Sequence, residues 1–193
     1  MRFYKFILPL HPNLLATMED INKNIELDFV IDRLTNSIRN TITSDSFPTE
    51  VSRLTLKDLK NVSKKKGWLF NWKKELEDDK KEVYKLTIVN NSAIIQGLIS
   101  FSRGVDHIFI ELLENAPFNI GKNKMYEGVA GNLVAYACKL SFLQGFDGFV
   151  AFIAKTTLVE HYKKTLGAHQ ISRQKMIIPT LSAKILVEKY FKT

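Results

Sequence analysis

The stretch Tyr126-Glu127-Gly128-Val129-Ala130-Gly131-Asn132-Leu133 decides how this sequence is interpreted, because it lies between a predicted strand and a predicted amphipathic helix. We expect the helix over residues 131–144, where apolar side chains recur with the helical period, and Gly145 is its predicted stop. Small residues let such a turn present its backbone N–H groups, and a helix N-terminus adds unpaired donors and partial positive charge. The stretch therefore favours a pyrophosphate site, with tight strand-to-helix packing as the alternative. It is neither a P-loop nor a dinucleotide-binding Gly-x-Gly-x-x-Gly.

Short β-rich runs and further helices surround this turn. Three strands are predicted over residues 82–89, 93–101 and 107–113, and the short turns between them favour an antiparallel meander. A buried strand over 148–154, a helix over 157–166, a strand over 175–178 and a helix over 182–190 follow. The order predicts a mixed α/β fold in which one strand-helix-strand crossover surrounds the glycine motif.

The first part of the chain is expected to be helical and basic. The apolar period over residues 13–40 predicts a helix, with a phase shift near Glu26. From Lys57 to Lys85, ten lysines and six acidic residues give a net charge of +4. Mixed signs favour a solvated face, with an anionic partner such as RNA as the alternative. The nearby Trp68 and Trp72 are expected to anchor this segment to the core. We expect residues 1–82 to pack on a core formed by residues 83–193.

Composition and cysteine usage narrow the class of protein. The 193 residues, 45% hydrophobic and 25% charged, are typical of one globular domain. No apolar run is long enough to cross a bilayer, and the apolar stretch from Phe6 to Leu10 is too short for a signal peptide. One cysteine, Cys138, excludes an internal disulfide, and the four histidines have no metal-ligand spacing. We therefore expect a cytoplasmic protein that neither spans nor binds a membrane and has no metal site.

The glycine turn resembles the acyl-CoA-binding motif of the GNAT superfamily of N-acetyltransferases. That motif is Gln/Arg-x-x-Gly-x-Gly/Ala with a leucine three residues further on, and it corresponds here to residues 125–130 and Leu133. Downstream, the family usually has a Tyr on the next helix followed by Lys-Leu-Gly-Phe or a similar run. These correspond here to Tyr162 and to residues 163–168. The resemblance covers about residues 83–180. Met125 replaces the usual Gln/Arg, and Lys155 replaces the usual Asn. The resemblance implies a GNAT-like, largely antiparallel central sheet flanked by helices, here with a helical N-terminal extension.

The resemblance also implies roles for individual residues. The cofactor would be held by the backbone of Leu112 and Leu113 along the pantetheine arm, by the turn residues Tyr126, Glu127, Gly128, Val129, Ala130, Gly131 and Asn132 at the pyrophosphate, and by Lys155. Tyr162 would donate a proton to the departing thiolate, unless it only packs its helix on the sheet. Glu111 would be the general base, with Glu114 behind it, unless it lies at an exposed edge. By strand alternation, Glu111 is expected to share a face with Phe109 and Leu113.

These residues fit direct transfer of an acetyl group from acetyl-CoA to an amine. Such a transfer needs a base, donors for the thioester oxygen and an acid for the thiolate, and no side-chain nucleophile. Cys138 is expected to be a core residue. The sequence does not identify the acceptor amine. The loop 114–125 is longer than is common in the family, and it is either a substrate-recognition insertion or a surface loop. Two alternatives stay open: a CoA-binding module without turnover, and a basic nucleic-acid-binding protein.

Overall fold

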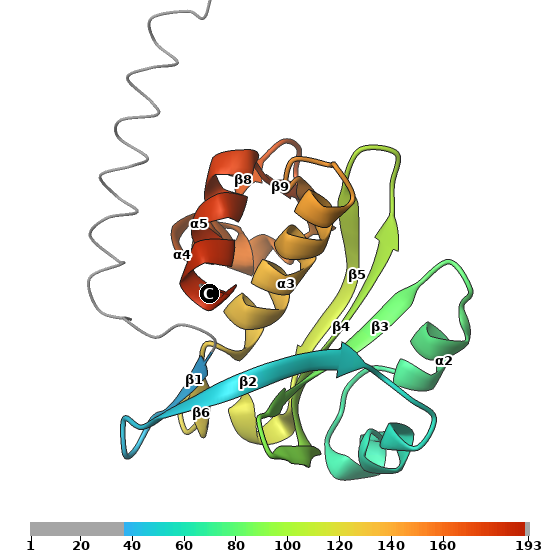
Figure 1. The fold of residues 1–193 in the computed structure, drawn as a ribbon, viewed down its shortest axis with the longest axis vertical. Coiled ribbons are helices and arrows are strands. Elements are labelled where there is room, and N and C mark those ends of the chain that lie inside the picture. The colour runs from blue at the N-terminus through green and yellow to red at the C-terminus, as the bar shows by residue number, and fades with distance from the viewer. Residues whose placement is uncertain (1–36, 192–193) are drawn as a thin grey trace, which may run out of the picture. The chain divides into compact units, whose positions relative to one another are not determined.

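A computed structural model describes residues 37–191 of the chain, which form one nine-stranded sheet with helices packed against it (Figure 1). The strands are β1 (Ser37–Asn40), β2 (Ser46–Arg53), β3 (Glu82–Ile88), β4 (Asn91–Arg103), β5 (Ile108–Asn115), β6 (Tyr126–Glu127), β7 (Val150–Ile153), β8 (His169–Gln170) and β9 (Lys175–Ile178). The α-helices are α2 (Trp72–Glu77), α3 (Val129–Leu143), α4 (Val159–Leu166) and α5 (Thr180–Phe191), with single 3₁₀ turns between some elements. Within residues 37–191, no helix is long and apolar enough to cross a bilayer.

The sheet order is β6-β1-β2-β3-β4-β5-β7-β9-β8, and every pair except β5–β7 is antiparallel. The predicted meander of β3, β4 and β5 is confirmed. The crossover from β5 through α3 to the parallel strand β7 is confirmed as well. The sheet is therefore mixed and largely antiparallel, as predicted.

Strand β1 corrects the helix predicted over residues 13–40. Ser37–Asn40 is extended and pairs with β2 on one side and β6 on the other, so the helical prediction is wrong for these four residues. The side chain of Asn40 accepts the backbone N–H groups of Ile42 and Thr43, which fixes the turn into β2. The rest of that predicted helix, and with it the helical extension, lies outside the described residues.

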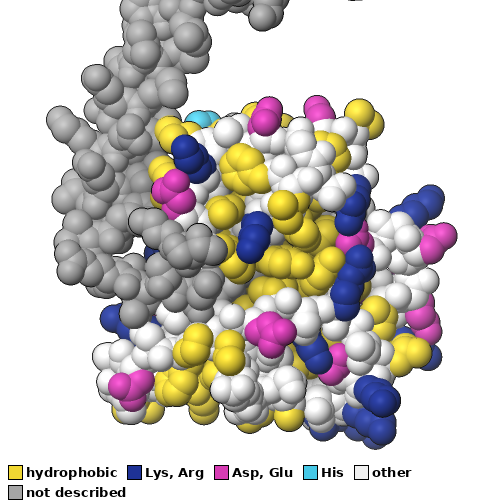
Figure 2. Space-filling model, viewed as in Figure 1, with side chains coloured by type: hydrophobic (Ala, Val, Ile, Leu, Met, Phe, Trp, Pro, Cys, Tyr) yellow, Lys and Arg dark blue, Asp and Glu magenta, His cyan; other side chains and the backbone are white. Residues whose placement is uncertain are grey.

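Two apolar cores lie on opposite faces of the sheet. The larger core contains Leu133, Cys138 and other α3 residues together with Ile99 and Ile110 of the sheet, and helix α5 packs beside α3 (Figure 1). Cys138 is fully buried there, as predicted, and burial raises the pKa of its thiol. On the side shown in Figure 2, hydrophobic side chains gather at the centre, and Lys and Arg side chains lie both among them and around the margin. This core holds α3 in place behind the glycine turn.

The smaller core attaches the lysine-rich segment to the other face. Trp68 and Trp72 are 4% and 1% exposed and pack against Leu98 of β4 and Val83 of β3. The prediction that these indoles anchor the segment is therefore confirmed, and neither ring is available to stack on a base. Because β2 pairs with β3 over five residues, residues before position 83 share the sheet with those after it. How residues 1–36 pack stays a prediction.

Candidate functional site

A fork opens in the sheet where β5 and β7 stop pairing. The two strands pair only at Ile108–Val150, Phe109–Ala151 and Ile110–Phe152, and β5 then continues to Asn115 beside β4 alone. Two adjacent parallel strands that separate leave one strand edge with unpaired backbone groups. The described residues thus contain an open edge along Glu111–Asn115, which includes Leu112 and Leu113, the two residues predicted to lie along a pantetheine arm.

The direction of the backbone groups along this edge follows from one hydrogen bond. The N–H of Ala116 donates to Gln96 of β4, so the alternation of an antiparallel pair turns Glu114 and Leu112 toward β4. The N–H and C=O groups of Leu113 and Asn115 consequently face the fork. Of the two residues predicted for the pantetheine arm, Leu113 is the one whose backbone faces the open edge.

A β-bulge at the mouth of the fork changes the predicted side-chain directions. Ser100 pairs with Leu112 whereas Phe101 pairs with Ile110, so Glu111 is the extra residue on β5. Leu113 packs with the α3-side core, while Leu112 packs with the α2-side core. The expectation that Glu111 and Leu113 share a face is therefore wrong, because the bulge shifts the alternation by one residue.

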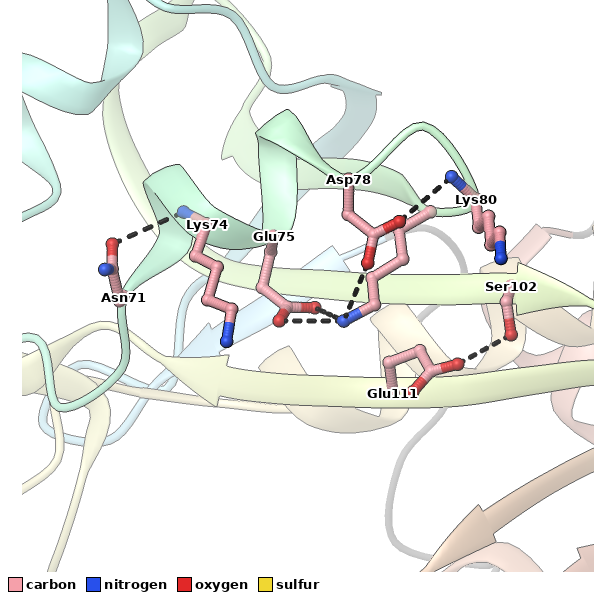
Figure 3. Close-up of polar contacts among 8 residues, drawn as sticks. Asn71, Lys74, Glu75, Asp78, Lys80, Ser102 and Glu111 are labelled. Atoms are coloured by element: carbon pink, nitrogen blue, oxygen red, sulfur yellow. Dashed lines mark hydrogen bonds and ion pairs between the residues drawn. The ribbon is translucent and has the colours of Figure 1, made fainter.

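The Glu111 carboxylate is exposed on the α2 side of the sheet. Its Oε1 accepts a hydrogen bond of 2.7 Å from Ser102 Oγ of the neighbouring strand (Figure 3). A second cluster lies above it, where Lys81 Nζ contacts both carboxylate oxygens of Glu75 at 3.0 and 3.1 Å and Asp78 at 3.6 Å. The hydrogen bond to Glu75 raises the pKa of Lys81, and the negative charges of Glu75, Glu111 and Asp78 add to that rise.

Glu114, the second candidate base, has a structural role. Its carboxylate is 4% exposed and accepts the backbone N–H of Leu69 at 2.6 Å and the indole N–H of Trp72 at 2.7 Å. The N–H of Phe70 donates at 3.4 Å. A buried carboxylate held by three N–H donors is not accessible to an incoming amine. Glu114 instead fastens the start of α2 to the fork end of β5.

Tyr162 lies on the opposite side of the sheet from Glu111. Its ring packs edge-on against the ring of Phe152, with 5.2 Å between the ring centroids, and Phe152 belongs to the α3-side core. Burial raises the pKa of the half-buried phenol, so it carries its proton at neutral pH. Lys155 lies two residues after the end of β7 and directly before the 3₁₀ turn Thr156–Leu158, with its side chain exposed.

The glycine turn forms the N-terminus of α3. Gly128 has φ of 86°, a left-handed conformation that a side chain strains, and it is the N-cap residue. The N–H of Tyr126 donates to Asn119 Oδ1, and that of Asn132 donates to the Gly128 carbonyl. The first helical turn, Val129–Gly131, therefore supplies the N–H groups that helix formation leaves unused.

Charged side chains flank this turn. Glu127 Oε2 contacts Arg39 Nη2 at 3.0 Å, and its Oε1 contacts Lys124 Nζ at 3.3 Å. The hydrogen bond from Arg39, aided by Lys124, lowers the pKa of Glu127 despite partial burial. Two cations thus face one carboxylate beside the N–H donors. Lys122 is exposed in the loop ahead of the turn.

Sequence reasoning missed the device that positions the turn. Asn119 is 2% exposed, and its Nδ2 donates to the backbone and side-chain oxygens of Gln96, both at 3.1 Å. Its Oδ1 accepts from Tyr126, so one buried amide ties the loop 114–125 to β4 and to the glycine turn. The sequence gives no sign that Asn119 is buried, because polar loop residues are mostly exposed. Gln96 lies within the long apolar run of β4, and that position could have indicated a buried polar partner.

Comparisons with known proteins find solved structures of similar fold. No protein-family model matches the chain, and no curated protein matches its sequence. Among solved structures, the ribosomal-protein-S18-alanine N-acetyltransferase from Escherichia coli is similar over 68% of this chain and 94% of its own, with TM-score 0.51 and 12% identity. Spermidine N-acetyltransferase from Vibrio cholerae in complex with CoA and spermine matches over 70% and 98%, with TM-score 0.51 and 13% identity. AtaTR bound with AcCoA matches over 72% and 97%, with TM-score 0.51 and 14% identity. These likenesses show that the chain has the fold of these acetyltransferases, which confirms the predicted GNAT-like architecture.

Proposed function

We propose that this chain, with its GNAT fold, transfers an acetyl group from acetyl-CoA to an amine. The observation that carries the proposal is the fork: β5 presents an unpaired edge from Glu111 to Asn115, and the chain then returns to a helix N-terminus with unused N–H groups. An extended amide-bearing arm and a pyrophosphate need these two features in series.

The residues present fit the cofactor. The backbone of Leu113 faces the fork, where an extended arm would pair with it. Asn115 Oδ1, on the same edge, is buried and has no hydrogen-bond partner among residues 37–191, so it offers an acceptor to an amide N–H of the arm. The Val129–Gly131 N–H groups would hold the pyrophosphate, Lys122 and Lys124 of the preceding loop would add positive charge, and we propose Lys155 as a further contact.

Glu111 and Tyr162 suit the two proton transfers. A thioester in the fork has the exposed Glu111 carboxylate on the α2 side and the protonated Tyr162 phenol on the α3 side. We propose that Glu111 takes a proton from the amine, directly or through water, as the C–N bond forms. The C–S bond then breaks, and the Tyr162 hydroxyl protonates the departing thiolate. Opposite faces suit the two roles because the amine enters and the thiolate leaves on different sides of the carbonyl carbon.

Two further features bear on the setting of this activity. Both indoles are buried, so this segment has no aromatic surface on which bases could stack. We therefore consider RNA only as a carrier of an aminoacyl group that could accept the acetyl group. The single buried cysteine suits a reducing compartment, and we propose the cytoplasm.

The experiment is acetyl-CoA binding by calorimetry on the full chain, followed by thiol release on a panel of amines. Binding with turnover supports the proposed function. Binding without turnover identifies a CoA-binding module that has lost catalysis, for which the replaced motif residues Met125 and Lys155 would be the first variants to test. Salt-sensitive RNA binding with no CoA binding would contradict the proposal.

A further inference from the structure

One row of side chains crosses the α2 side of the sheet beside the fork. Ile153 of β7 pairs with Lys175 of β9, and Glu111 is one position beyond the last paired residues of β5 and β7. The neighbouring positions Phe152 and Met176 belong to the α3-side core, so Ile153 and Lys175 point to the other face, where Glu111 lies. Across the row, the acidic Glu111, the apolar Ile153 and the basic Lys175 therefore follow one another.

The row is accessible to a ligand. Ile153 is 58% exposed, and both Glu111 and Lys175 are exposed. Lys175 makes no ion pair with any residue in the described range 37–191. Glu111 and Lys175 lie two strands apart in the sheet order, and β5 has already separated from β7 at Glu111, so their Cα atoms are more than two strand spacings, about 10 Å, apart. Both side chains are long enough to reach a small molecule that lies over Ile153.

A hollow that opens to solvent extends from Lys175 toward the start of β5 and β7, with both apolar and polar side chains in its walls. It encloses about 620 Å³ and includes Ala151, Ile177 and Lys175 among its walls. Ala151 pairs with Ile177 on the same face as the row, so these two apolar side chains form part of the floor, and Ala151 lies two positions before Ile153 on β7. The acidic residues Asp106 and Asp147 line the end away from the fork. A side chain of a few carbons, and not a second charged group, suits the floor beside Lys175.

From this arrangement we infer that the acceptor is a small zwitterionic amine, an amino acid with an apolar side chain. Its amino group would lie at Glu111, its carboxylate at Lys175, and its side chain over Ala151 and Ile177. The inference rests on the proposed function, since it takes Glu111 as the group that receives the amine proton. Lys175 is then a specificity residue that binds the acceptor and takes no part in the proton transfers.

The probes that test this inference are L-leucine and 3-methylbutylamine, which is leucine without its carboxylate. Each is titrated onto the full chain by NMR, with and without saturating CoA, and each is tested as an acceptor by thiol release. We expect leucine to bind more tightly and to have the lower KM. Lys175→Gln should raise the Kd and KM for leucine about fivefold, as expected for an exposed ion pair, and leave those for 3-methylbutylamine unchanged. Lys175→Arg should retain the preference for leucine, and Lys184→Gln on the exposed side of α5 is the matched control.

Three outcomes overturn the inference. The first is equal affinity of the wild-type chain for the two probes, and the second is a Lys175→Gln effect of the same size on both. The third is no detectable binding of leucine to the CoA-loaded chain. Failure of the proposed function has a different signature, because the chain would then bind no CoA, whereas leucine titration onto the free chain would still report on Lys175.

Discussion

Glu111 and Tyr162 lie on opposite faces of the sheet at the point where β5 and β7 part: the carboxylate accepts a hydrogen bond from Ser102 on the α2 side, while the phenol ring packs on Phe152 on the α3 side. Ordinary alternation after Ile110 puts Glu111 on the α2 side, and the bulge then turns Leu112 to the α2 side and Leu113 to the α3 side. A group bound in the fork would therefore have an acid and a base on its two sides.

Replacing Tyr162 with phenylalanine should lower kcat by roughly 10²-fold, the lower end for general acid catalysis. The effect is moderate because a thiolate leaves without full protonation at neutral pH. The ring still packs on Phe152, so the melting temperature and CoA affinity should change little. Steady-state kinetics on an accepted amine checks this, and a wild-type kcat would reduce Tyr162 to a packing residue.

Replacing Glu111 with glutamine should lower kcat by roughly 10²- to 10³-fold, because the amide cannot take the amine proton. The exposed side chain contributes little to folding, so the urea midpoint should remain that of the wild type. Ser102→Ala, which removes the hydrogen bond to Glu111 and leaves the carboxylate, should have a much smaller effect. Equal losses in both variants would mean that Glu111 acts through Ser102 and not as the base.

Replacing Glu114 with glutamine should cost about 2 kcal/mol of unfolding free energy, because an amide NH₂ then faces buried N–H donors. The Glu111→Gln variant is the matched control, since it makes the same chemical change at an exposed site. Urea unfolding followed by tryptophan fluorescence reports on Trp68 and Trp72, the two tryptophans of the chain. No loss of stability would contradict the anchoring role of Glu114.

The pair of Asp58 and Lys85 predicts a pH dependence of stability. Burial works to raise the pKa of Asp58, but hydrogen bonds from Lys85 at 2.6 Å and from Thr55 outweigh it, and the net shift is downward. A lowered folded pKa stabilises the protein above the unfolded pKa of about 3.9, and that contribution is lost as pH falls through the folded value.

Asp58→Asn should therefore cost about 1 kcal/mol at pH 7, and the difference from wild type should narrow below about pH 4. Asp79→Asn, at an exposed acid of the same segment, is the control and should match the wild type throughout. Urea midpoints measured from pH 3 to pH 7 provide the test. A difference that stays constant with pH would show that the charge of Asp58 is not what stabilises this contact.

The sequence was informative where the local pattern and the tertiary structure agree. The meander, α3, β7 and α4 follow from periodicity, apolar runs and turn residues, because α3 and α4 bury one regular face whereas β4 and β7 are buried on both faces. Strand β1 was missed because Ser37–Asn40 continues a helical period, and its extended form depends on pairing with β2 and β6, which are distant in sequence. The same limit applies to Glu114 and Asn119, whose buried partners no local pattern identifies.

The bulge at Glu111 shows the same limit within the candidate site. Strand alternation assigned Glu111 and Leu113 to one face, and a single extra residue separated them. Bulges depend on the register between two strands, which a single sequence pattern does not contain. The sequence alone could identify the candidate residues on this strand, whereas it could not predict which face of the sheet each side chain occupies.

The measurement that tests the central claim most directly is CoA binding by the wild-type chain and by Gly128→Glu, read by calorimetry. Gly121→Glu is the matched control, because Gly121 also has positive φ, 82° against 86°, and its missing Cβ would meet open space. We predict that the wild type and Gly121→Glu bind CoA, and that Gly128→Glu does not, because its carboxylate would put bulk and negative charge beside the Val129–Gly131 donors. Melting curves establish that both variants are folded. Failure of the wild type to bind CoA, or undiminished binding by a folded Gly128→Glu variant, would contradict the account.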